Sequence, residues 1–334
     1  MDEKNRITLA EVAMAAGVSK MTASRALRGA GDVSTKNIDK VRQAAREMGY
    51  VGNHLASSLS GQRSSLIGVI VPSMANIVFA EVLAGIAEGI EGSGLQPVFG
   101  VTDYDLEKEY DVIRNMLSWN PAGLIVTGLD QSGDARQLLE NAKIPVVQIM
   151  DLDGDPVDAC VGFSQHAAGG EMAEALLGLG RKRIGYVGCG LNADFRARKR
   201  FDGFRDALAR GGLEVASSRI SEDLSTVKAG RELTAQILKD RPDLDCIYYS
   251  NDDLAAGGAF HCISAGLSVP DDLLLAGFNG LEFVKSLPVA IATSLTPRRE
   301  IGKAAAEIVL GSHQANAVKT RTRIAFQPTI DLGV

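Results

Sequence analysis

From residue 66 onward, short apolar runs alternate with longer stretches of helical periodicity, and this alternation limits the folds open to the chain. Each run is continuously apolar, which is typical of strands buried on both faces of a parallel sheet. The runs are LIGVIV, PVFGV, GLIVTG, PVVQIM, RIGYVG, CIYYSN and LLLAGF. We therefore expect an α/β fold with parallel sheets over this part of the chain.

Polar residues follow many of these runs. Ligands of open parallel sheets lie beyond the carboxyl ends of the strands. The segments expected at those ends are VPSMAN, GVTDYD, IMDLD, GCGLNAD and YSNDD. Two such sheets placed side by side would form a two-lobed protein that binds a ligand in the cleft between its lobes.

The length and composition indicate a globular protein with more than one domain. The chain has 334 residues, and 46% of them are hydrophobic, which is ample for buried cores. No apolar run approaches the roughly 18 residues that a membrane span needs, and the first residues, MDEKNRITLA, lack the apolar centre of a signal peptide. We therefore expect a cytoplasmic protein without a membrane partner.

The spacing of reactive residues does not match a metal site, a cofactor site or a catalytic motif. The sequence contains no C-x-x-C, H-E-x-x-H, G-x-S-x-G or P-loop pattern. The glycines of RIGYVGCG lack the G-x-G-x-x-G spacing, and a calcium loop starting at Asp151 would end on Gly162 instead of glutamate. We expect no metal, no cofactor and no enzyme activity. The scattered cysteines and histidines are Cys160, Cys189, Cys246, Cys262, His54, His166, His261 and His313.

Charge divides unevenly along the chain, whose formal net charge is −6. Residues 1–63 contain 10 Lys and Arg against 6 Asp and Glu, whereas residues 64–334 contain 25 against 35. A basic head on an acidic body fits a first segment that binds nucleic-acid phosphates. A modestly basic segment also arises by chance, so the charge only supports other observations.

The first fifty residues carry the signals of three short helices. Thr8 and Glu11 form a capping box that opens the first helix, and Gly17 ends it. A second helix follows at once from the N-cap Ser19, across a tight turn that contains glycine. A third helix is predicted from Ser34 to Gly49. This pattern predicts a helix-turn-helix, the small all-α part of the expected fold.

The second helix of a helix-turn-helix enters the major groove of DNA, so its outer residues meet base edges and phosphates. The candidates for base-edge contact are Lys20, Met21 and Arg25, and those for phosphate contact are Thr22, Ser24 and Arg28. Thr8 and Ser19 complete the predicted DNA-binding set of the headpiece. The alternative is an ordinary solvated helix face.

These segments resemble the headpiece and hinge of the lactose-repressor (LacI) family of bacterial transcription regulators. The resemblance rests on ITLAEVAMAAGVSKMTASRAL, VSTKNIDKVRQAAREMGY and NHLASSLSG, and it continues over nearly the whole chain. It is strongest for the gluconate-utilisation repressor branch, through VFAEVLAGI, MLSW, IMD, VGF, NDDLA and LTPR. The family arrangement implies a helix-turn-helix headpiece at residues 1–52, a hinge at 53–63, an N-terminal lobe at 64–164 and 293–326, and a C-terminal lobe at 165–292.

The resemblance also implies a short hinge helix that lies in the minor groove of DNA. Its implied contacts are Asn53, His54, Ala56 and Leu59, with Leu59 wedged into a base step. An isolated helix of about eight residues is marginal in water, so it should form only when two copies meet on DNA. Gly52 stands where the family usually has proline, which leaves the hinge entry less restrained. The alternative is a flexible linker, because SSLSGQRSS is rich in serine and glycine.

The family's ligand pocket, carried over position by position, implies an effector site in the cleft. The implied residues are Ser73, Phe79, Asp151, Arg200, Leu224, Asn251, Asn279, Thr296 and Arg298. Asn279 stands where sugar-binding relatives often have an acidic residue. This neutral amide, together with Arg200 and Arg298, favours an anionic effector such as a gluconate-like sugar acid, because arginine binds carboxylates bidentately. The alternative is that Arg298 pairs with Asp151 or another carboxylate of the lobes.

We therefore expect a homodimeric repressor of carbohydrate-metabolism genes that binds double-stranded operator DNA and is controlled by a small effector. Effector binding would reorient the lobes and change the spacing of the two hinges. The helix around Val82–Ile90 is the expected dimer contact, and the absence of a heptad tail after RIAFQPTIDLGV favours a dimer over a tetramer. The alternative is a solute-binding protein of a sugar transport system, which shares the two-lobed body but has no headpiece.

Overall fold

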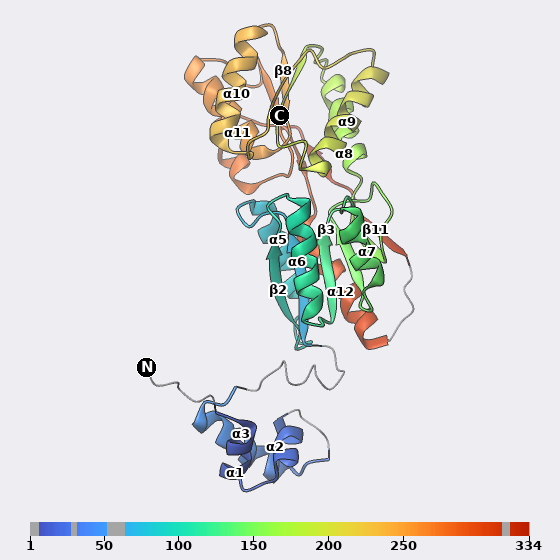
Figure 1. Ribbon diagram of the computed structural model, residues 1–334. Helices are drawn as coiled ribbons and strands as arrows, with labels where there is room; N and C mark the ends of the chain where they lie inside the picture. The colour runs from blue at the N-terminus through green and yellow to red at the C-terminus, as the bar shows by residue number, and fades with distance from the viewer. Residues whose placement is uncertain (1–6, 28–31, 52–63, 316–320, 334) are drawn as a thin grey trace. The chain divides into compact units, whose positions relative to one another are not determined.

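The chain forms two compact units, Met1–Ser64 and Ser65–Val334, in a computed structural model. The structure describes residues 7–27, 32–51, 64–315 and 321–333, with only the backbone for residues 313–315. In the described residues the first unit contains helices alone, and the strands all lie in the second unit (Figure 1).

The first unit contains α1 (Leu9–Ala15), α2 (Lys20–Leu27) and α3 (Thr35–Met48). Thr8 Oγ1 accepts a hydrogen bond from Glu11 N (3.3 Å) and Glu11 Oε2 accepts one from Thr8 N (2.6 Å), which is the predicted capping box. Gly17 follows with φ +65°, a conformation that favours a residue without Cβ. Ser19 Oγ then accepts a hydrogen bond from Thr22 N (3.1 Å) at the start of α2. The predicted helix-turn-helix is confirmed.

The third helix ends as predicted but begins without a side-chain cap. Ser34 occupies the N-cap position, and no cap hydrogen bond to its hydroxyl is present in the described headpiece. Gly49 ends the helix in the left-handed conformation. The three helices enclose a core of small apolar residues, namely Val12, Ala13, Ala16, Ala23, Ala26, Val41, Ala44 and Ala45.

The first lobe of the second unit is built on a parallel sheet whose strand order is β11-β5-β4-β3-β1-β2. The strands are β1 (Leu66–Val71), β2 (Gln96–Val101), β3 (Gly123–Thr127), β4 (Val146–Ile149), β5 (Ala159–Gly162) and β11 (Thr322–Ala325). One face of the sheet packs against α5 (Ile77–Gly89) and α12 (Arg298–Ala315). The other face packs against α6 (Leu106–Ser118) and α7 (Gly133–Asn141). Because helices cover both faces, neighbouring strand residues such as Val69 and Ile70 are both buried.

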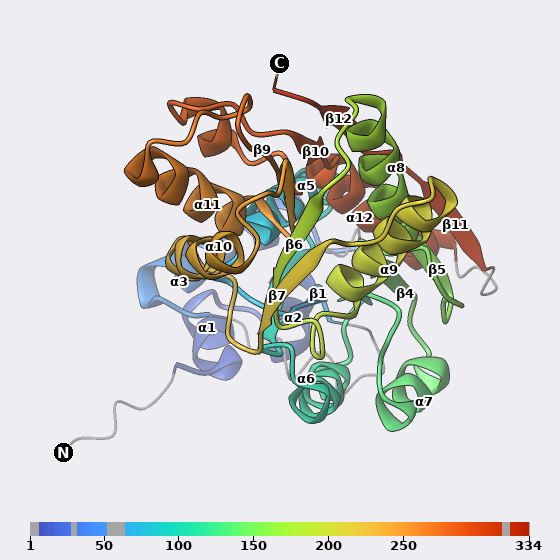
Figure 2. The same cartoon turned by 90° about the horizontal axis from the view of Figure 1, so that it is seen from above.

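The second lobe repeats this architecture with the strand order β7-β6-β8-β9, again all parallel. The strands are β6 (Ile184–Cys189), β7 (Ser217–Ser221), β8 (Cys246–Tyr249) and β9 (Leu274–Ala276). Figure 2 shows α8 (Gln165–Gly178) and α9 (Phe195–Arg210) on one side of this sheet, with α10 (Val227–Asp240) and α11 (Asp252–Ala265) on the other. The predicted α/β fold of parallel sheets is confirmed.

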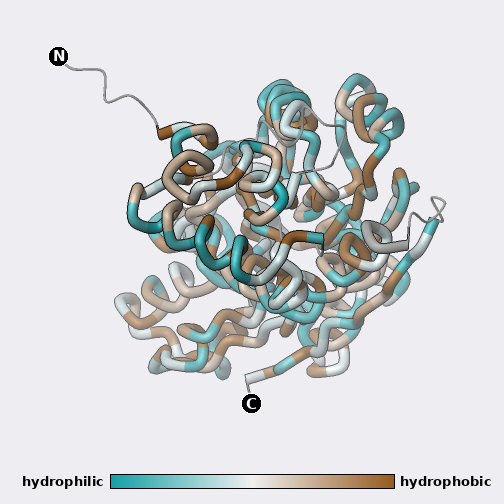
Figure 3. Tube along the Cα trace, turned by 90° about the horizontal axis from the view of Figure 1, so that it is seen from below, coloured by the Kyte–Doolittle hydropathy of each residue, from teal (hydrophilic) through white to brown (hydrophobic). Residues whose placement is uncertain are grey.

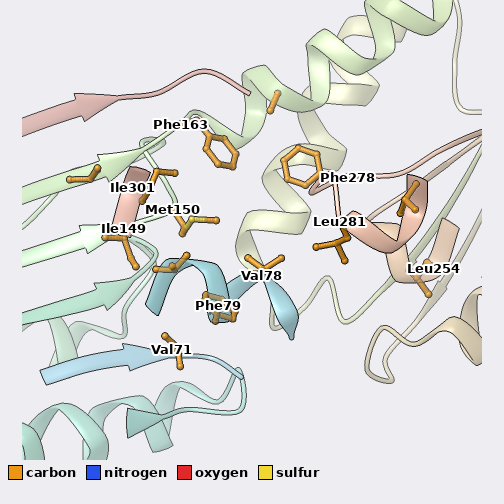
Figure 4. Packing of buried hydrophobic residues seen from close by; sticks show 14 of the residues in the cluster. Val71, Val78, Phe79, Ile149, Met150, Phe163, Leu254, Phe278, Leu281 and Ile301 are labelled. Carbon is orange, nitrogen blue, oxygen red and sulfur yellow. The ribbon is translucent and has the colours of Figure 1, made fainter. Parts of the chain in front are cut away.

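The chain passes between the two lobes several times. It leaves the first sheet from β5 into α8, and it returns through the short helix η1 (Glu282–Ser286) and β10 (Thr293–Leu295) into α12. After β11 it crosses again, because β12 (Thr329–Asp331) pairs antiparallel with β10. The rings of Phe163 and Phe278, which follow β5 and β9, lie 6.1 Å apart where the lobes meet (Figure 4). The lobe boundaries implied by the family resemblance remain a prediction.

Helices α5 and α12 approach each other closely at glycines. A Cβ atom on Gly85 would clash with the backbone carbonyl of Arg299, and one on Gly302 would clash with that of Val82. The side chains of Val82 and Ile86 are fully buried here. The main apolar residues of the helix expected at the dimer contact therefore belong to the core of their own lobe, and Ala87 and Glu88 are its exposed residues within 82–90.

Hydrophilic and hydrophobic residues alternate along the helices, as the coloured tube in Figure 3 shows. This pattern is typical of helices that bury one face. Even α12, the helix with 18 residues, contains charged side chains such as Arg299 and Glu300. Within the described ranges, no helix is both long enough and apolar enough to cross a membrane.

Candidate functional site

The outer face of α2 presents the residues predicted to contact base edges. Lys20, Met21 and Arg25 are exposed, and Met21 retains 70% of its accessible surface. Arg25 forms an ion pair with Asp32, which lies shortly before α3. Both side chains of this pair are about half exposed, so the pair is weak and a DNA phosphate or base can compete with Asp32 for the guanidinium.

Several of the predicted DNA contacts are hydroxyl groups that also lie at the N-terminal ends of helices α1 and α2. Thr8 caps α1, and the hydroxyl oxygens of Ser19 and Thr22 lie 2.8 Å apart at the start of α2. Ser24 is half-buried on the same helix. The remaining predicted contacts lie outside the described residues, and the DNA-binding role of the whole set remains a prediction. These remaining contacts are Arg28, Asn53, His54, Ala56 and Leu59.

A cavity of about 400 Å³, partly open to solvent, lies where strands of both lobes end. The first lobe lines it from the start of α5 and from the ends of β4 and β5, and the second lobe lines it from α9, α11 and the end of β9. Figure 4 shows Phe79, Met150, Phe163 and Phe278 in this region. Four of the residues predicted to bind the effector line this cavity: Phe79, Arg200, Asn251 and Asn279.

Arg200 is buried, and both of its terminal nitrogens already donate to the protein. Nη1 donates to Oε1 of Gln165 (2.6 Å) and Nη2 donates to the backbone carbonyl of Ser250 (3.1 Å). The guanidinium carbon lies 4.1 Å from the ring centre of Phe278, a cation–π contact. Nε is buried and has no hydrogen-bond partner among the described residues. Arg200 is therefore a rigid part of the cavity wall.

Arg196 also lines the cavity, although it is not among the residues that the family resemblance indicates. It precedes Arg200 by four residues on α9, so both side chains lie on one face of the helix. Its side chain is 12% exposed, its Nε lies 3.5 Å from Oδ1 of Asp194, and its guanidinium lies 5.6 Å from the ring centre of Phe79. Burial alone would lower the pKa of Arg196, but the charge of Asp194 raises it, so the group stays charged. The four-residue spacing from Arg200 places it on the same helix face, but that spacing alone does not show that it lines the cavity.

A second cavity of about 470 Å³, also partly open to solvent, shares Tyr104, Asp194 and Arg196 with the first. Its wall adds the oxygen-bearing side chains of Glu109, Asp130 and Gln131. Burial raises the pKa of Glu109 to about 7, although a hydrogen bond with Gln131 and the charge of Arg196 act in the opposite direction. The two cavities together offer two cations, Arg196 and Arg200, and several hydrogen-bond acceptors.

Asp151, another predicted effector residue, is fully buried and bonded to Lys199 of the opposite lobe. Lys199 Nζ lies 2.6 Å from Asp151 Oδ2, 2.7 Å from Asp130 Oδ2 and 3.0 Å from the backbone carbonyl of Asp153. Burial alone would lower the pKa of Lys199, but the hydrogen bonds with Asp130 and Asp151 raise it. Asp151 lines neither described cavity, and it acts as a link between the lobes.

Arg298 is likewise occupied by groups of the protein. Its Nε and Nη2 donate to the two carboxylate oxygens of Glu81, each at 3.0 Å. Its Nη1 donates to the hydroxyl of Thr296 (2.8 Å) and to the backbone carbonyl of Asn279. The side chain is 5% exposed and lines neither described cavity. The sequence left two roles open for Arg298, an effector contact or an ion pair with a carboxylate of the lobes. In the structure Arg298 forms the ion pair, and Glu81 is its partner.

The other predicted effector residues lie away from the two cavities. Thr296 donates its hydroxyl to the carbonyl of Asn279 (3.2 Å) and supports Arg298. Ser73 Oγ accepts a hydrogen bond from Ala75 N (3.1 Å) within its own loop. Leu224 is 72% exposed. None of these three side chains contacts either described cavity, and their role in effector binding remains a prediction.

A helix-turn-helix unit followed by a two-lobed unit with cavities between its lobes defines a ligand-controlled, DNA-binding regulator. Residues 8–53 match the family described as "Bacterial regulatory proteins, lacI family". Residues 64–328 match "Periplasmic binding proteins and sugar binding domain of LacI family". The chain belongs to the LacI family, and it is a DNA-binding transcriptional regulator with an effector-binding domain.

Relatives of known class support this assignment. The chain is 42% identical to the HTH-type transcriptional regulator GntR of Pseudomonas aeruginosa over 91% of this chain and 89% of that protein. It is 38% identical to GntR of Escherichia coli over 95% of both. Among solved structures, a LacI-family transcriptional regulator from Silicibacter pomeroyi matches with a TM-score of 0.93 and 47% identity over 98% of both chains. The lac repressor dimer bound to operator and an anti-inducer matches with a TM-score of 0.82 and 26% identity, again over 98% of both chains.

No resident metal site is evident in the parts of the chain that the structure covers. There, no group of three or more His, Cys, Asp or Glu side chains is arranged to hold a metal ion. The four cysteines are all buried and unpaired as disulfides. The relatives named above are transcriptional regulators.

Proposed function

We propose that this protein is a cytoplasmic, homodimeric repressor of carbohydrate-metabolism genes whose operator binding is controlled by a sugar acid such as gluconate. The observation that carries the proposal is the combination of an exposed basic face on α2 with an arginine-lined cavity between two lobes. The similarity to GntR and to the HTH-type transcriptional regulator IdnR of Escherichia coli, at 32% identity, supports a regulator of this branch.

Operator binding is tested by selecting bound duplexes from random DNA and titrating the best duplex at several salt concentrations. A repressor of this type binds the selected duplex at least about a thousandfold more tightly than unrelated DNA, and its affinity falls linearly with the logarithm of salt concentration. A solute-binding protein would show no affinity for any duplex.

Repeating the titration with gluconate, glucose and buffer alone tests control by a sugar acid. Equal DNA affinity in all three solutions would contradict that control.

The dimer proposal rests on apolar side chains exposed on the first lobe. Met74, shortly before α5, and Ile77, at its start, retain 55% and 53% of their accessible surface, and Phe99 on the edge strand β2 retains 42%. Contact with a second copy at this surface would remove their apolar area from water. Sedimentation at micromolar concentration should give a dimer, and an Ile77→Asp variant should shift it toward monomer. A stable tetramer, or a variant with unchanged dimerisation, would contradict the proposal.

A further inference from the structure

Four cationic side chains stand near the cleft, and their hydrogen bonds show which of them has donors for an anionic ligand. They are Arg196, Lys199, Arg200 and Arg298. A carboxylate needs donors that the protein does not already use, because breaking an existing charged pair offsets the energy that the new pair provides. The donors of each group therefore decide where a carboxylate binds.

In two of the four cations, every donor nitrogen already has a hydrogen-bond partner in the protein. Lys199 has three donors, and three oxygens accept from its ammonium group: Asp130, Asp151 and the backbone of Asp153. Arg298 uses Nε and both terminal nitrogens on Glu81, Asn279 and Thr296. Neither side chain lines the described cavities. A ligand carboxylate therefore gains little from either group.

Arg200 is only partly available. Its two terminal nitrogens donate to Gln165 and to the backbone of Ser250, and only Nε is left without a partner in the described structure. A carboxylate that binds a guanidinium in a bidentate way requires two neighbouring donors. Any such pair includes at least one terminal nitrogen of Arg200, and both already donate to Gln165 or Ser250, so a ligand carboxylate would have to compete with these partners.

Arg196 differs from these three groups. Its Nε has one long contact, 3.5 Å to Asp194, and its terminal nitrogens donate no hydrogen bond to any residue that the structure describes. The side chain is only 12% exposed and lies over the ring of Phe79, so its guanidinium is positioned by packing. It is also the one cation that lines both described cavities. A buried guanidinium with free terminal donors at the junction of two cavities is suited to bind an anion.

We propose that Arg196 binds the carboxylate of the effector and thereby selects sugar acids over neutral sugars. The inference rests on the proposed sugar-acid control and adds the residue that recognises the acid. The hydroxyl chain of the ligand extends into the second cavity, where Asp130 offers its Oδ1 for a hydroxyl proton while its Oδ2 accepts from Lys199. The matching ligand is a small molecule with one carboxylate and a polyhydroxylated chain.

Calorimetric titration of the full chain with gluconate and with glucitol tests this proposal. Glucitol has the same six-carbon hydroxyl chain but no carboxylate. The wild type should prefer gluconate, and Arg196→Gln should weaken gluconate binding at least about tenfold while glucitol binding changes less than about twofold. Arg196→Lys, which keeps the charge but not the paired donors, should fall between the two. Arg205→Gln is the matched control, because Arg205 lies on the same helix, is 59% exposed and lines neither cavity.

The outcomes separate this inference from the function on which it rests. If the wild type binds gluconate and Arg196→Gln binds it equally well, the role of Arg196 is wrong and sugar-acid control stands. If the wild type binds no sugar acid, both the role of Arg196 and the proposed control by a sugar acid are wrong. Equal loss of gluconate and glucitol binding in Arg196→Gln would assign Arg196 a purely structural role and would also overturn the inference. Thermal unfolding and the glucitol titration of each variant show whether the cleft is intact.

Discussion

Lys199 on α9 of the second lobe donates a hydrogen bond to Asp151 at the end of β4 in the first lobe, over 2.6 Å. Asp151 is fully buried, and Asp130 from the end of β3 accepts from the same ammonium group. Two strand ends of one lobe are therefore bonded to one helix of the other. This link joins the lobes beside the cavities.

Lys199→Met should destabilise the second unit by roughly 3 kcal/mol, because it leaves the buried carboxylate of Asp151 without its counter-charge. Chemical denaturation measures the loss. Adding Asp151→Asn to this variant should recover part of the stability, since the second change removes the unpaired charge. Lys228→Met is the control, because Lys228 is 83% exposed and its pair with Glu232 contributes little. Equal stability of Lys199→Met and the control would show that the link contributes nothing.

The free energy of unfolding should decrease as pH rises from about 4.5 to about 7. The pKa of Glu109 is raised by burial to about 7 in the folded chain, so in this window the folded state holds a proton that the unfolded state has released. Glu109→Gln should remove most of this decrease and be more stable than the wild type at pH 8 by up to roughly 3 kcal/mol. Denaturant titrations between pH 5 and pH 8 measure the difference.

Burial also raises the pKa of Asp252, to about 6. Asp252 therefore lowers the free energy of unfolding as pH rises toward 6, in the same direction as Glu109. The Glu109→Gln variant should keep this smaller pH dependence below pH 6. Glu107→Gln, an exposed change on the same helix, should retain the full pH dependence of the wild type. A Glu109→Gln variant whose stability follows the wild type at every pH would show that Glu109 does not hold its proton in the folded state.

Gly85→Ala should destabilise the first lobe by about 1–3 kcal/mol, because the added methyl group would meet the backbone carbonyl of Arg299 in α12. A rigid backbone atom cannot move aside as a flexible side chain can. The matched control is Gly133→Ala in α7, where the added Cβ has no neighbour within 4 Å. That control should be neutral or stabilising by up to about 1 kcal/mol. Thermal unfolding of both variants decides the matter, and an unchanged Gly85→Ala protein would refute the close packing of α5 on α12.

Arg25→Ala should weaken binding to the selected operator by about 1–3 kcal/mol, or roughly 5- to 150-fold, and should reduce the preference for operator over unrelated DNA. Asp32→Asn should act in the opposite direction and strengthen DNA binding by up to about fivefold, because it releases Arg25 from its ion pair. Fluorescence anisotropy with labelled duplexes at fixed salt measures both effects. Equal affinity of Arg25→Ala and wild type for the operator would exclude Arg25 from the DNA interface.

Local signals in the sequence were sufficient for the headpiece and for the most buried strands. The Thr8–Glu11 capping box, Gly17 and Gly49 each act within a few residues of themselves, and the structure contains all three as predicted. Buried strands such as β1 are recognisable because every residue must be apolar. β7 (Ser217–Ser221) escapes this signal, because it is an edge strand with polar residues, and β5 (Ala159–Gly162) has only four residues.

The candidate site was predictable only in part. The positions carried over from the family's ligand pocket include Phe79, Arg200, Asn251 and Asn279, and these four residues do line one cavity. Family position also indicates Arg298, but whether a guanidinium is free or paired depends on Glu81, which is 217 residues away in the chain. Arg196 escapes the family pattern, and its importance emerges only when the hydrogen bonds of all the cleft cations are compared.

The sequence by itself determined the helix-turn-helix, the alternation that makes the body α/β, and the family to which the chain belongs. These properties depend on residues that are close together in the chain, because capping, helical periodicity and strand burial are local effects. Only the tertiary structure decided that Lys199 joins the two lobes and that Arg196 retains free donors beside the cavities. The state of a buried charge depends on partners that folding brings from distant segments, and no local pattern records which partners arrive.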